Sequence, residues 1–514
     1  MAIAQTNTLA AQAPAPRLSL ARVSELPSSV ARPGYDVAGV ACGILHLGIG
    51  AFHRAHQAFY TDAALAGGET GWGIVGASLR AASVRDRLAP QNCLYTLVEK
   101  SGAGARRRVI GAVRDVIYAP EDRARLPALI ADPRIRIVSL TVTEKGYCHD
   151  PASGRLNPAH PDIVHDLGEP QAPVSAIGIL VAGLRQRRRA GAPITLLSCD
   201  NLPHNGAVLR GLVLDFAARL DPVAAQWIER AVAFPCSMVD RIVPATTDAL
   251  IEETTAALGF ADLAPVQCEP FSQWVVEDRF AAGRPAWDKA GAEMVADVAP
   301  FEEMKLRLLN GSHSMLAYLG YLSGFEYIWQ VMRAPEYVAL MREMMRAEVQ
   351  PRLALNGRYD LATYQQTLIE RFANPALAHR CYQIAMDGSQ KLPQRLLGTI
   401  RVNLAAGLPI RRLALAVAAW MRYVGGIDER GNRIAVQDPL ADELAARVAR
   451  AGGDPGAIVD ALLAVRAVFG DDLPASAPFK GELRAALASL FADGARATVQ
   501  RYAAQQTNQG GRAP

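Results

Sequence analysis

Nearly continuous hydrophobic runs in the first half of the chain predict strands that are buried on both faces. The four clearest runs are CGILHL (42–47), WGIVGASL (72–79), IRIVSLTVT (135–143) and PITLLSCDN (193–201). They contain many β-branched residues, as strands inside a parallel sheet do. Helical patterns such as PVSAIGILVAGLRQRRRA (173–190) alternate with them. This alternation predicts an α/β domain with a doubly wound sheet over residues 35–295.

From about residue 300 the hydrophobic pattern changes to that of long helices. The clearest segments are FEEMKLRLLNGSHSMLAYLGYL (301–322), APEYVALMREMMRAEVQ (334–350), LATYQQTLIERFA (361–373) and RLALAVAAWMRYV (412–424). Apolar residues three and four positions apart are typical of amphipathic helices. We therefore expect a mainly α-helical domain over residues 296–514. We expect a mobile tail over residues 1–34.

Composition and charge are those of an ordinary globular protein and indicate neither a nucleic-acid nor a membrane partner. The chain has 514 residues, of which 50% are hydrophobic and 20% charged, and a net charge of +4. No apolar run approaches the roughly 20 residues that span a bilayer. Seven scattered cysteines without a CxxC pair suit a reducing compartment. The start of the chain does not read as a signal peptide, so we expect a cytoplasmic protein, either a monomer or a small homo-oligomer.

The first predicted strand runs into a glycine-containing turn and a helix, LHLGIGAFHRAH (45–56). Gly48 lets the chain turn, and Gly50 lets a pyrophosphate approach the backbone at the helix N-terminus. His53 stands where a standard dinucleotide fingerprint has its third glycine, so the motif alone also fits a simple turn. The flanking strand and helix favour a dinucleotide site. The cofactor contacts expected here are Gly48, Gly50, Ala51, Phe52 and Arg54.

Other polar residues near this turn have two interpretations. Arg54 is placed to hold a phosphate, but a solvated salt bridge would explain it equally well. His46, His53 and His56 lack the further ligands of a zinc site, and we expect no metal there.

The residues after the second predicted strand bear on the choice between NAD and NADP. A ribose-binding carboxylate is usual at this place, but the chain reads LRAASVRDR, with Ala82 and Ser83 at the expected position. Arg80 and Arg85 lie nearby, and nothing acidic at Ala82 or Ser83 repels a 2′-phosphate. We expect NAD as the cofactor, with NADP partly tolerated, and contacts from Arg80 and Ser83.

Three polar residues, Lys305, Asn310 and His313, interrupt the apolar segment EMKLRLLNGSHSML. A snorkelling lysine, a backbone-bonded asparagine and a core histidine explain them without a site. With α-helical geometry of about 100° and 1.5 Å per residue, Asn310 and His313 share a face. Lys305 would lie about 80° round from His313 and roughly 12 Å along the axis. The segment alone leaves both interpretations open.

Polar residues also follow several predicted strands, at the edge where parallel sheets bind ligands. SCDNLPHNG supplies Asp200 and Asn201, and TVTEKGY supplies residues 144–145; FPCSMVDRIVP, which follows none of the four runs, adds Asp240 and Arg241. Turn capping would explain Asn201 structurally, and an ion pair would explain Asp240 with Arg241.

One family shows similar segments in the same order between residues 35 and 500. The matching segments are LGIGAFHRAHQAFYTDAAL, TVTEKGYC, SCDNLPHNGAV, FPCSMVDRIVPATT, CEPFSQWVVEDRFAAGRPAW, EEMKLRLLNGSHSMLAYLGYL and IAMDGSQKLPQR. They resemble the polyol-specific long-chain dehydrogenases of the mannitol dehydrogenase family. The resemblance implies a Rossmann-type domain that binds NAD, a helical domain for substrate and catalysis, and hydride transfer without a metal.

The resemblance also implies roles for the polar residues. The family's catalytic lysine falls on Lys305, which, if burial lowers its pKa, would take the hydroxyl proton. Asn201 and Asn310 would donate hydrogen bonds to the developing alkoxide. His313 would orient the substrate, and Glu302 would relay the proton to solvent.

Two branches of the family resemble this chain in the region expected to bind substrate. Asp240 is an expected substrate contact whichever branch applies. The mannitol dehydrogenase branch shares SCDNLPHNGAV but carries an arginine where this chain has Gln383. The fructuronate reductase branch shares QIAMDGSQKLPQRLL, including Gln383. Lys391 or Arg395 would hold a sugar-acid carboxylate, because a buried carboxylate needs a cationic partner; a helix-surface position would be the structural explanation of Arg395.

The expected substrate is therefore a small sugar acid or polyol. We expect interconversion of D-mannonate and D-fructuronate first. D-mannitol and D-fructose, or a related polyol, are the alternative. A non-catalytic dinucleotide-binding regulator is the remote alternative.

Overall fold

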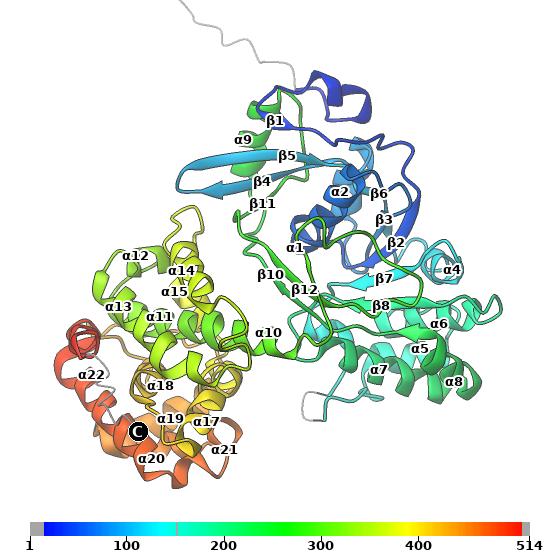
Figure 1. The fold of residues 1–514 in the computed structure, drawn as a ribbon. Coiled ribbons are helices and arrows are strands. Elements are labelled where there is room, and N and C mark those ends of the chain that lie inside the picture. Colours follow the sequence, from blue (N-terminus) through cyan, green and yellow to red (C-terminus); the bar gives the residue numbers. More distant parts are fainter. Residues whose placement is uncertain (1–14, 151–152, 506–514) are drawn as a thin grey trace, which may run out of the picture. The chain divides into compact units, whose positions relative to one another are not determined.

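The structure is a computed structural model that describes residues 15–150 and 153–505. It divides the chain into two compact units, Met1–Val298 and Ala299–Pro514, whose elements are labelled in Figure 1. All strands of the described residues belong to the first unit, and the second is built from helices. The predicted order of an α/β domain followed by a mainly helical domain is confirmed.

A six-stranded sheet forms the centre of the first unit, with the order β6-β3-β2-β7-β8-β9. Its strands in the described chain are β2 (Cys42–Leu47), β3 (Gly73–Ser78), β6 (Val113–Tyr118), β7 (Ile137–Leu140), β8 (Ile194–Ser198) and β9 (Val232–Ala233). Each neighbouring pair is parallel, which confirms the predicted parallel sheet. Because the strands are parallel, their carboxyl ends lie at one edge. Gly48, Arg80 and Asn201 follow the ends of β2, β3 and β8.

Both faces of this sheet are buried, as the hydrophobic runs predicted. Ile44 and Ile137 pack with residues of α1 and α2, whereas their neighbours Leu45 and Val138 pack with residues of α4, α6 and α7. The helices of the first unit in the described chain are α1 (Ala51–Ala55), α2 (Gln57–Ala66), α3 (Ser83–Leu88), α4 (Arg125–Ala131), α5 (Pro161–Gly168), α6 (Ala176–Arg187), α7 (Asn205–Leu220), α8 (Pro222–Ala231) and α9 (Asp248–Leu258), with 3-10 turns η1 (Leu20–Glu25), η2 (Ala89–Gln91) and η3 (Glu144–Tyr147).

Two smaller sheets in the described part of this unit had not been predicted. One has the order β1 (Val30–Ala31), β5 (Gly104–Ile110), β4 (Tyr95–Ser101) and β11 (Val266–Cys268). The other has the order β10 (Ser237–Asp240), β12 (Gln273–Glu277) and β13 (Glu293–Val295). The second sheet fixes the place of Asp240, which ends β10.

The predicted mobile tail is wrong from residue 15 onward, and residues 1–14 lie outside the described residues. Leu18 and Leu26 are buried in a cluster with Val109 and Leu258, and β1 pairs in parallel with β5. The apolar residues of this segment show neither a helical nor a strand period. Only their contacts with distant parts of the chain order the segment.

The second unit is entirely helical in its described elements. They are α10 (Ala299–Met304), α11 (Gly311–Leu322), α12 (Ile328–Val331), α13 (Pro335–Glu343), α14 (Leu361–Phe372), α15 (Cys381–Ala385), α16 (Gly388–Leu392), α17 (Gly398–Ala405), α18 (Arg411–Tyr423), α19 (Ala441–Arg450), α20 (Pro455–Leu463), α21 (Arg466–Phe469) and α22 (Ala477–Ala504), with 3-10 turns η6 (Gln350–Arg352) and η8 (Leu473–Ala475). Of the helices in residues 15–150 and 153–505, none has both the length and the apolar character to cross a membrane.

Three further segments in the described part of the second unit are π-helical: η4 (Lys305–Asn310), η5 (Met344–Val349) and η7 (Pro393–Leu397). η4 packs against both of the others. A Cβ on Gly311 would lie 3.0 Å from the carbonyl oxygen of Arg395, so this glycine lets α11 begin against η7. A π-helix has i→i+5 hydrogen bonds and a wider turn. The α-helical angle and distance predicted for Lys305 are therefore wrong.

Candidate active site

The turn after β2 has a backbone geometry that requires glycine at its first position. Gly48 has a φ of 97°, and a Cβ there would lie 2.1 Å from the carbonyl oxygen of Thr141. Gly50 is exposed, and a Cβ there would meet no atom closer than 3.8 Å. Ala51 and Phe52 follow as the half-buried first residues of α1. The backbone of this turn is accessible at the position predicted for a pyrophosphate.

A pair of buried histidines supports the turn. The rings of His46 and His53 stack with centroids 3.4 Å apart. Nδ1 of His46 is 2.8 Å from Ser139 Oγ, and its Nε2 is 2.8 Å from Thr141 Oγ1. Burial lowers the pKa of His46 to about 3, so the ring is neutral at ordinary pH. At the third fingerprint position, the ring of His53 therefore packs flat against the ring of His46, which belongs to β2.

Arg54 contacts the interior of the first unit. Its Nη1 donates a hydrogen bond to the carbonyl oxygen of Ala264 at 2.6 Å, and its Nε donates to that of Gly50 at 3.3 Å. The guanidinium also lies over the ring of Tyr95. The solvated salt bridge considered for Arg54 is wrong, because the side chain is buried. Its observed contacts hold the Gly50 turn against the segment before β11.

The region after β3 carries exposed and paired charges. Arg80 and Ser83 are exposed, and Ala82 precedes α3. Nη1 of Arg85 lies 2.7 Å from a carboxylate oxygen of Glu121. The sequence did not place Glu121 here, because it follows β6, about 40 residues later in the chain. The charge of Glu121 is offset by Arg85.

Asn201 and Asp240 both follow or end strands of the first unit. Asn201 is exposed three residues after the end of β8, and Asp240 is buried at the end of β10. The carboxylate of Asp200 accepts hydrogen bonds from the backbone N–H groups of Val142 and Thr143. These bonds tie the loop after β7 to the segment that carries Asn201.

Arg241 has a structural environment of its own. Its Nη2 lies 2.6 Å from a carboxylate oxygen of Glu99, and its Nη1 donates to the carbonyl oxygen of Ala55. Arg241 therefore forms an ion pair with Glu99, whereas the sequence suggested Asp240 as its partner.

Glu302, Lys305 and Asn310 lie on one helical stretch of the second unit. Glu302 belongs to α10, whereas Lys305 and Asn310 begin and end η4. All three side chains are half-buried. In an α-helix, residues five positions apart would lie about 140° apart around the axis. In a π-helix they are roughly one turn apart, so the π geometry brings Lys305 and Asn310 towards the same side.

His313 is packed against rings and surrounded by positive charge. Its ring centroid is 4.8 Å from that of Phe372 and 5.5 Å from that of His379. Burial lowers the pKa of His313 well below its ordinary value, and the neighbouring His379 and Arg395 lower it further. The imidazole is therefore neutral, and its surroundings favour an anion.

Lys391 and Arg395 are held close to this histidine. Nη1 of Arg395 donates to Ser314 Oγ at 3.1 Å, and Nζ of Lys391 donates to the carbonyl oxygen of Met386 at 2.6 Å. Burial lowers the pKa of both side chains, and Arg395 lowers that of Lys391 further. The helix-surface interpretation of Arg395 is wrong, because the side chain is partly buried. Gln383, also predicted to bind substrate, is exposed on α15.

Sequence reasoning missed several residues of this environment. They are Ser314, Arg371, Phe372 and His379. Ser314 follows His313 and was hidden in an apolar helix, whereas the other three lie in or just after α14. No local pattern relates α14 to His313, so a signal for these residues was absent from the sequence.

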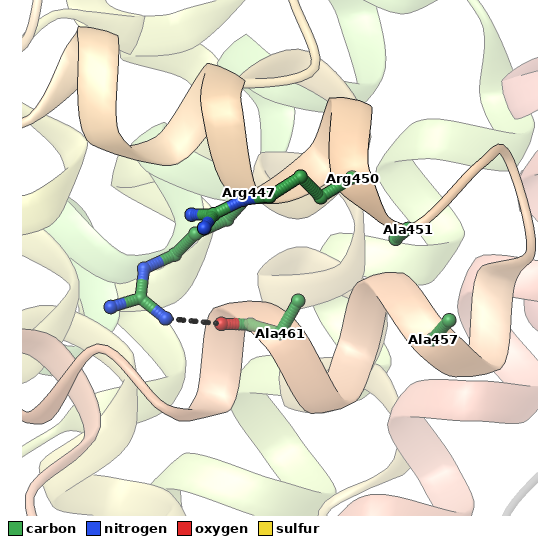
Figure 2. A pocket seen from close by; sticks show the side chains of 5 residues that line it. All are labelled: Arg447, Arg450, Ala451, Ala457 and Ala461. Atoms are coloured by element: carbon green, nitrogen blue, oxygen red, sulfur yellow. Dashed lines mark hydrogen bonds between the residues drawn. The ribbon is translucent and has the colours of Figure 1, made fainter.

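A separate surface pocket lies between α19 and α20 of the second unit (Figure 2). It is lined by Arg447, Arg450, Ala451, Ala457 and Ala461, and its volume is about 320 Å³. Nη1 of Arg447 donates to the carbonyl oxygen of Ala461 at 3.3 Å. None of the predicted site residues lines this pocket, and we assign it no part in catalysis.

Within the described ranges, one group of side chains has the composition of a metal site. Potential ligand atoms of Cys148, His160 and Asp162 lie within 4.8 Å of one another. Nδ1 of His160 accepts a hydrogen bond from the backbone N–H of Asp162 and caps α5. Burial raises the pKa of Cys148 to about 11, so its thiol is protonated. The helix cap accounts for this cluster.

Both units match models of one protein family. The mannitol dehydrogenase Rossmann-domain model matches residues 42–289. The mannitol dehydrogenase C-terminal-domain model matches residues 297–491. The two matches follow the order of the two units.

Several known proteins are similar to this chain over 87–94% of its length. The uncharacterized oxidoreductase YeiQ of Escherichia coli (strain K12) is 50% identical over 452 residues, which are 87% of this chain and 92% of that protein. The D-mannonate oxidoreductase of the same strain is 48% identical over 481 residues, 93% of this chain and 98% of that protein. The solved ternary complex of Pseudomonas fluorescens mannitol 2-dehydrogenase with NAD and D-mannitol is 43% identical, with a TM-score of 0.81 and coverage of 94% of this chain and 99% of that chain.

Proposed function

The chain belongs to the mannitol dehydrogenase family, and on that premise we propose that it interconverts D-mannonate and D-fructuronate with NAD as the cofactor. As a member of this family it is an oxidoreductase of polyol or sugar-acid CH–OH groups. The choice of the sugar acid is the proposed part. D-mannitol and D-fructose form the second candidate pair, favoured by the similarity to a solved complex with D-mannitol.

The positive charge around His313 is the observation that favours a sugar acid as the substrate. Lys391, Arg395 and Arg371 all lie close enough to His313 to lower its pKa. Arg371 is 6% exposed, and the other two side chains are half-buried. A carboxylate that leaves water needs such cationic partners, whereas a hydroxymethyl group gains little from them. The 48% identity to a D-mannonate oxidoreductase supports the same choice.

The turn after β2 fits a dinucleotide. A Cβ at Gly50 would meet only one atom within 4 Å, at 3.8 Å, so the backbone there can approach a pyrophosphate closely. NAD⁺, when bound, accepts the hydride from the substrate carbon. The residues we assign to it are Gly48, Gly50, Ala51, Phe52, Arg80 and Ser83. Ala82 and Ser83 offer no carboxylate against a 2′-phosphate, so NADP is partly tolerated.

Polar side chains of the protein would transfer the proton and donate hydrogen bonds to the substrate oxygen. Nζ of Lys305 would take the hydroxyl proton, which leaves the oxygen free to become the carbonyl oxygen as the carbon is oxidised. Amide N–H groups of Asn201 and Asn310 donate to the oxygen as negative charge develops on it. The neutral His313 orients a substrate hydroxyl, and Glu302 passes the proton from Lys305 to solvent.

A steady-state assay that follows NADH absorbance tests this proposal. It compares mannonate, mannitol, arabinitol and sorbitol, each with NAD and with NADP. We expect the highest kcat/KM for mannonate with NAD. A preference for mannitol over mannonate would favour the second candidate. Tight NADH binding without turnover of any of these substrates would favour a non-catalytic regulator.

A further inference from the structure

The side chain of Asp200 joins the carboxyl ends of two neighbouring strands. Its Oδ1 accepts a hydrogen bond from the backbone N–H of Thr143 at 2.9 Å. Its Oδ2 accepts from the N–H of Val142 at 3.1 Å and from the hydroxyl of Tyr147 at 2.8 Å. All three donors belong to the loop after β7, whereas Asp200 follows β8. One carboxylate therefore fixes two loops at the ligand-binding edge of the sheet.

The loop after β7 depends on these bonds. Thr143 has a φ of 63°, a conformation that is rare for a β-branched residue and costs free energy. Tyr147 is fully buried, and its hydroxyl also lies 2.6 Å from Ser198 Oγ. Two of the three bonds to Asp200 come from backbone groups at or next to Thr143. The carboxylate thus compensates for the strained backbone at this position.

Asn205 fixes the same segment from its other end. Its Nδ2 donates to the carbonyl oxygens of Asp200 at 3.1 Å and Ser237 at 2.8 Å. Its Oδ1 accepts from the backbone N–H of Ser237 at 3.0 Å. The backbone N–H of Leu202 also donates to the carbonyl oxygen of Asp200. Asn201 is thereby held between anchored residues on both sides.

We propose that Asp200 is a positioning residue that, together with Asn205, holds the backbone of Asn201 where its amide meets the substrate oxygen. The inference rests on the proposed function, since it needs Asn201 to serve the reaction. In the proposed reaction Lys305 takes the proton, and the two oxygens of Asp200 accept three hydrogen bonds from the loop after β7. Its effect on the reaction passes through Asn201.

Asp200→Asn tests this inference with little change in volume. A carboxamide has one acceptor oxygen, so its NH2 group would face at least one of the three donors. The loop after β7 and the segment of Asn201 must then shift, and a displacement of about 1 Å can cost about 100-fold in rate. We expect kcat for the best substrate to fall at least about tenfold, with a larger primary deuterium isotope effect because hydride transfer becomes slower.

Asp166→Asn is the matched control. Asp166 is a fully buried carboxylate of the same unit, and it accepts from the backbone N–H groups of Val174 and Ser175 and from Ser175 Oγ. Like Asp200 it accepts from two backbone N–H groups and one hydroxyl, but Nδ1 of His165 also lies 3.0 Å from its Oδ1, and it ties α5 to the start of α6. We expect a comparable loss of thermal stability and an unchanged kcat per folded molecule. Equal losses of kcat in both variants would overturn the inference.

A double-mutant cycle separates positioning from general damage. If Asp200 acts through Asn201, Asp200→Asn should lower kcat in the wild-type background but hardly at all after Asn201→Ala. Fully additive losses would overturn the inference. Tyr147→Phe removes one of the three hydrogen bonds to Asp200 and should lower kcat by a smaller factor. It replaces Asp200→Asn in the double-mutant cycle if Asp200→Asn does not fold. A wild-type enzyme inactive on every substrate would overturn the proposed function, and the role of Asn201 with it.

Discussion

Nη1 of Arg395 donates a hydrogen bond to Oγ of Ser314 at 3.1 Å. The bond joins η7 to α11 at the residue directly after His313. The carbonyl oxygen of Arg395 also lies 3.0 Å from the position of a Cβ on Gly311. Both the backbone and the side chain of this arginine are therefore fixed against the first turn of α11. This places a partly buried cation beside the histidine expected to orient the substrate.

Replacement of Arg395 should separate acidic from neutral substrates. Arg395→Met should lower kcat/KM for mannonate by roughly 2–4 kcal/mol, the range for a broken buried charge pair, and should change kcat/KM for a neutral polyol little. The control is Arg484→Met, because Arg484 is an exposed arginine in the same unit. Steady-state kinetics with both substrates provide the measurement. Equal losses on both substrates would make Arg395 a structural residue.

Lys305→Ala tests the general base. The variant should lose about 100-fold or more in kcat, while its affinity for NADH, measured by fluorescence titration, stays near that of the wild type. Lys289→Ala, at an exposed lysine, should behave like the wild type. A chelator should leave the wild-type rate unchanged, since the proposed reaction uses no metal. A Lys305→Ala variant with near-normal turnover would refute the assignment.

Ala82→Asp tests the location of the ribose pocket. A carboxylate at this position should repel a 2′-phosphate and raise the ratio of kcat/KM for NAD to that for NADP by about tenfold, equivalent to about 1.4 kcal/mol. Ala82→Asn has the same shape without the charge and should leave the ratio nearly unchanged. If the ratio is the same in all three proteins, the ribose lies elsewhere.

A buried ion pair predicts a large effect on stability. Glu348 and Arg412 are 0% and 3% exposed, and the carboxylate of Glu348 also accepts from the backbone N–H groups of Arg412 and Leu413 at the start of α18. Glu348→Gln should lower the free energy of unfolding by about 3 kcal/mol, because the buried guanidinium of Arg412 loses the negative charge that offsets its own. Asp460→Asn, which breaks the exposed pair with Arg484, should cost less than about 1 kcal/mol. Urea denaturation of both variants distinguishes these expectations.

Histidine burial predicts how stability depends on pH. Burial lowers the pKa of His379 to about 4, whereas the pKa of a histidine in the unfolded chain is about 6.5. Between these values the unfolded chain binds more protons, so the free energy of unfolding falls as the pH is lowered from about 6.5 to about 4. His379→Gln should flatten this part of the curve, measured by urea denaturation at a series of pH values. Parallel curves for the two proteins would contradict the lowered pKa.

The sequence by itself determined the features that depend on neighbouring residues. The hydrophobic runs 42–47 and 193–201 predicted buried strands, because a strand inside a parallel sheet is apolar on both faces. Gly48 marked a turn that only glycine can make without strain, and the structure gives it a φ of 97°. Lys305, Asn310 and His313 were found because they interrupt an apolar helical pattern. Each of these signals extends over only a few positions of the chain.

The tertiary structure decided what depends on contacts between distant residues. The segment of Lys305 is π-helical where it packs against η5 and η7, and its residues fit an α-helical period equally well. Arg371 and His379 lie near His313 only because the chain folds back through α14, and Asp200 meets Thr143 only because β7 and β8 are neighbours in the sheet. Residues 15–34 lacked a period and were ordered by burial against other segments. Periodicity reports which face of one element is buried, whereas these features arise from the free energy of packing between elements that the sequence separates.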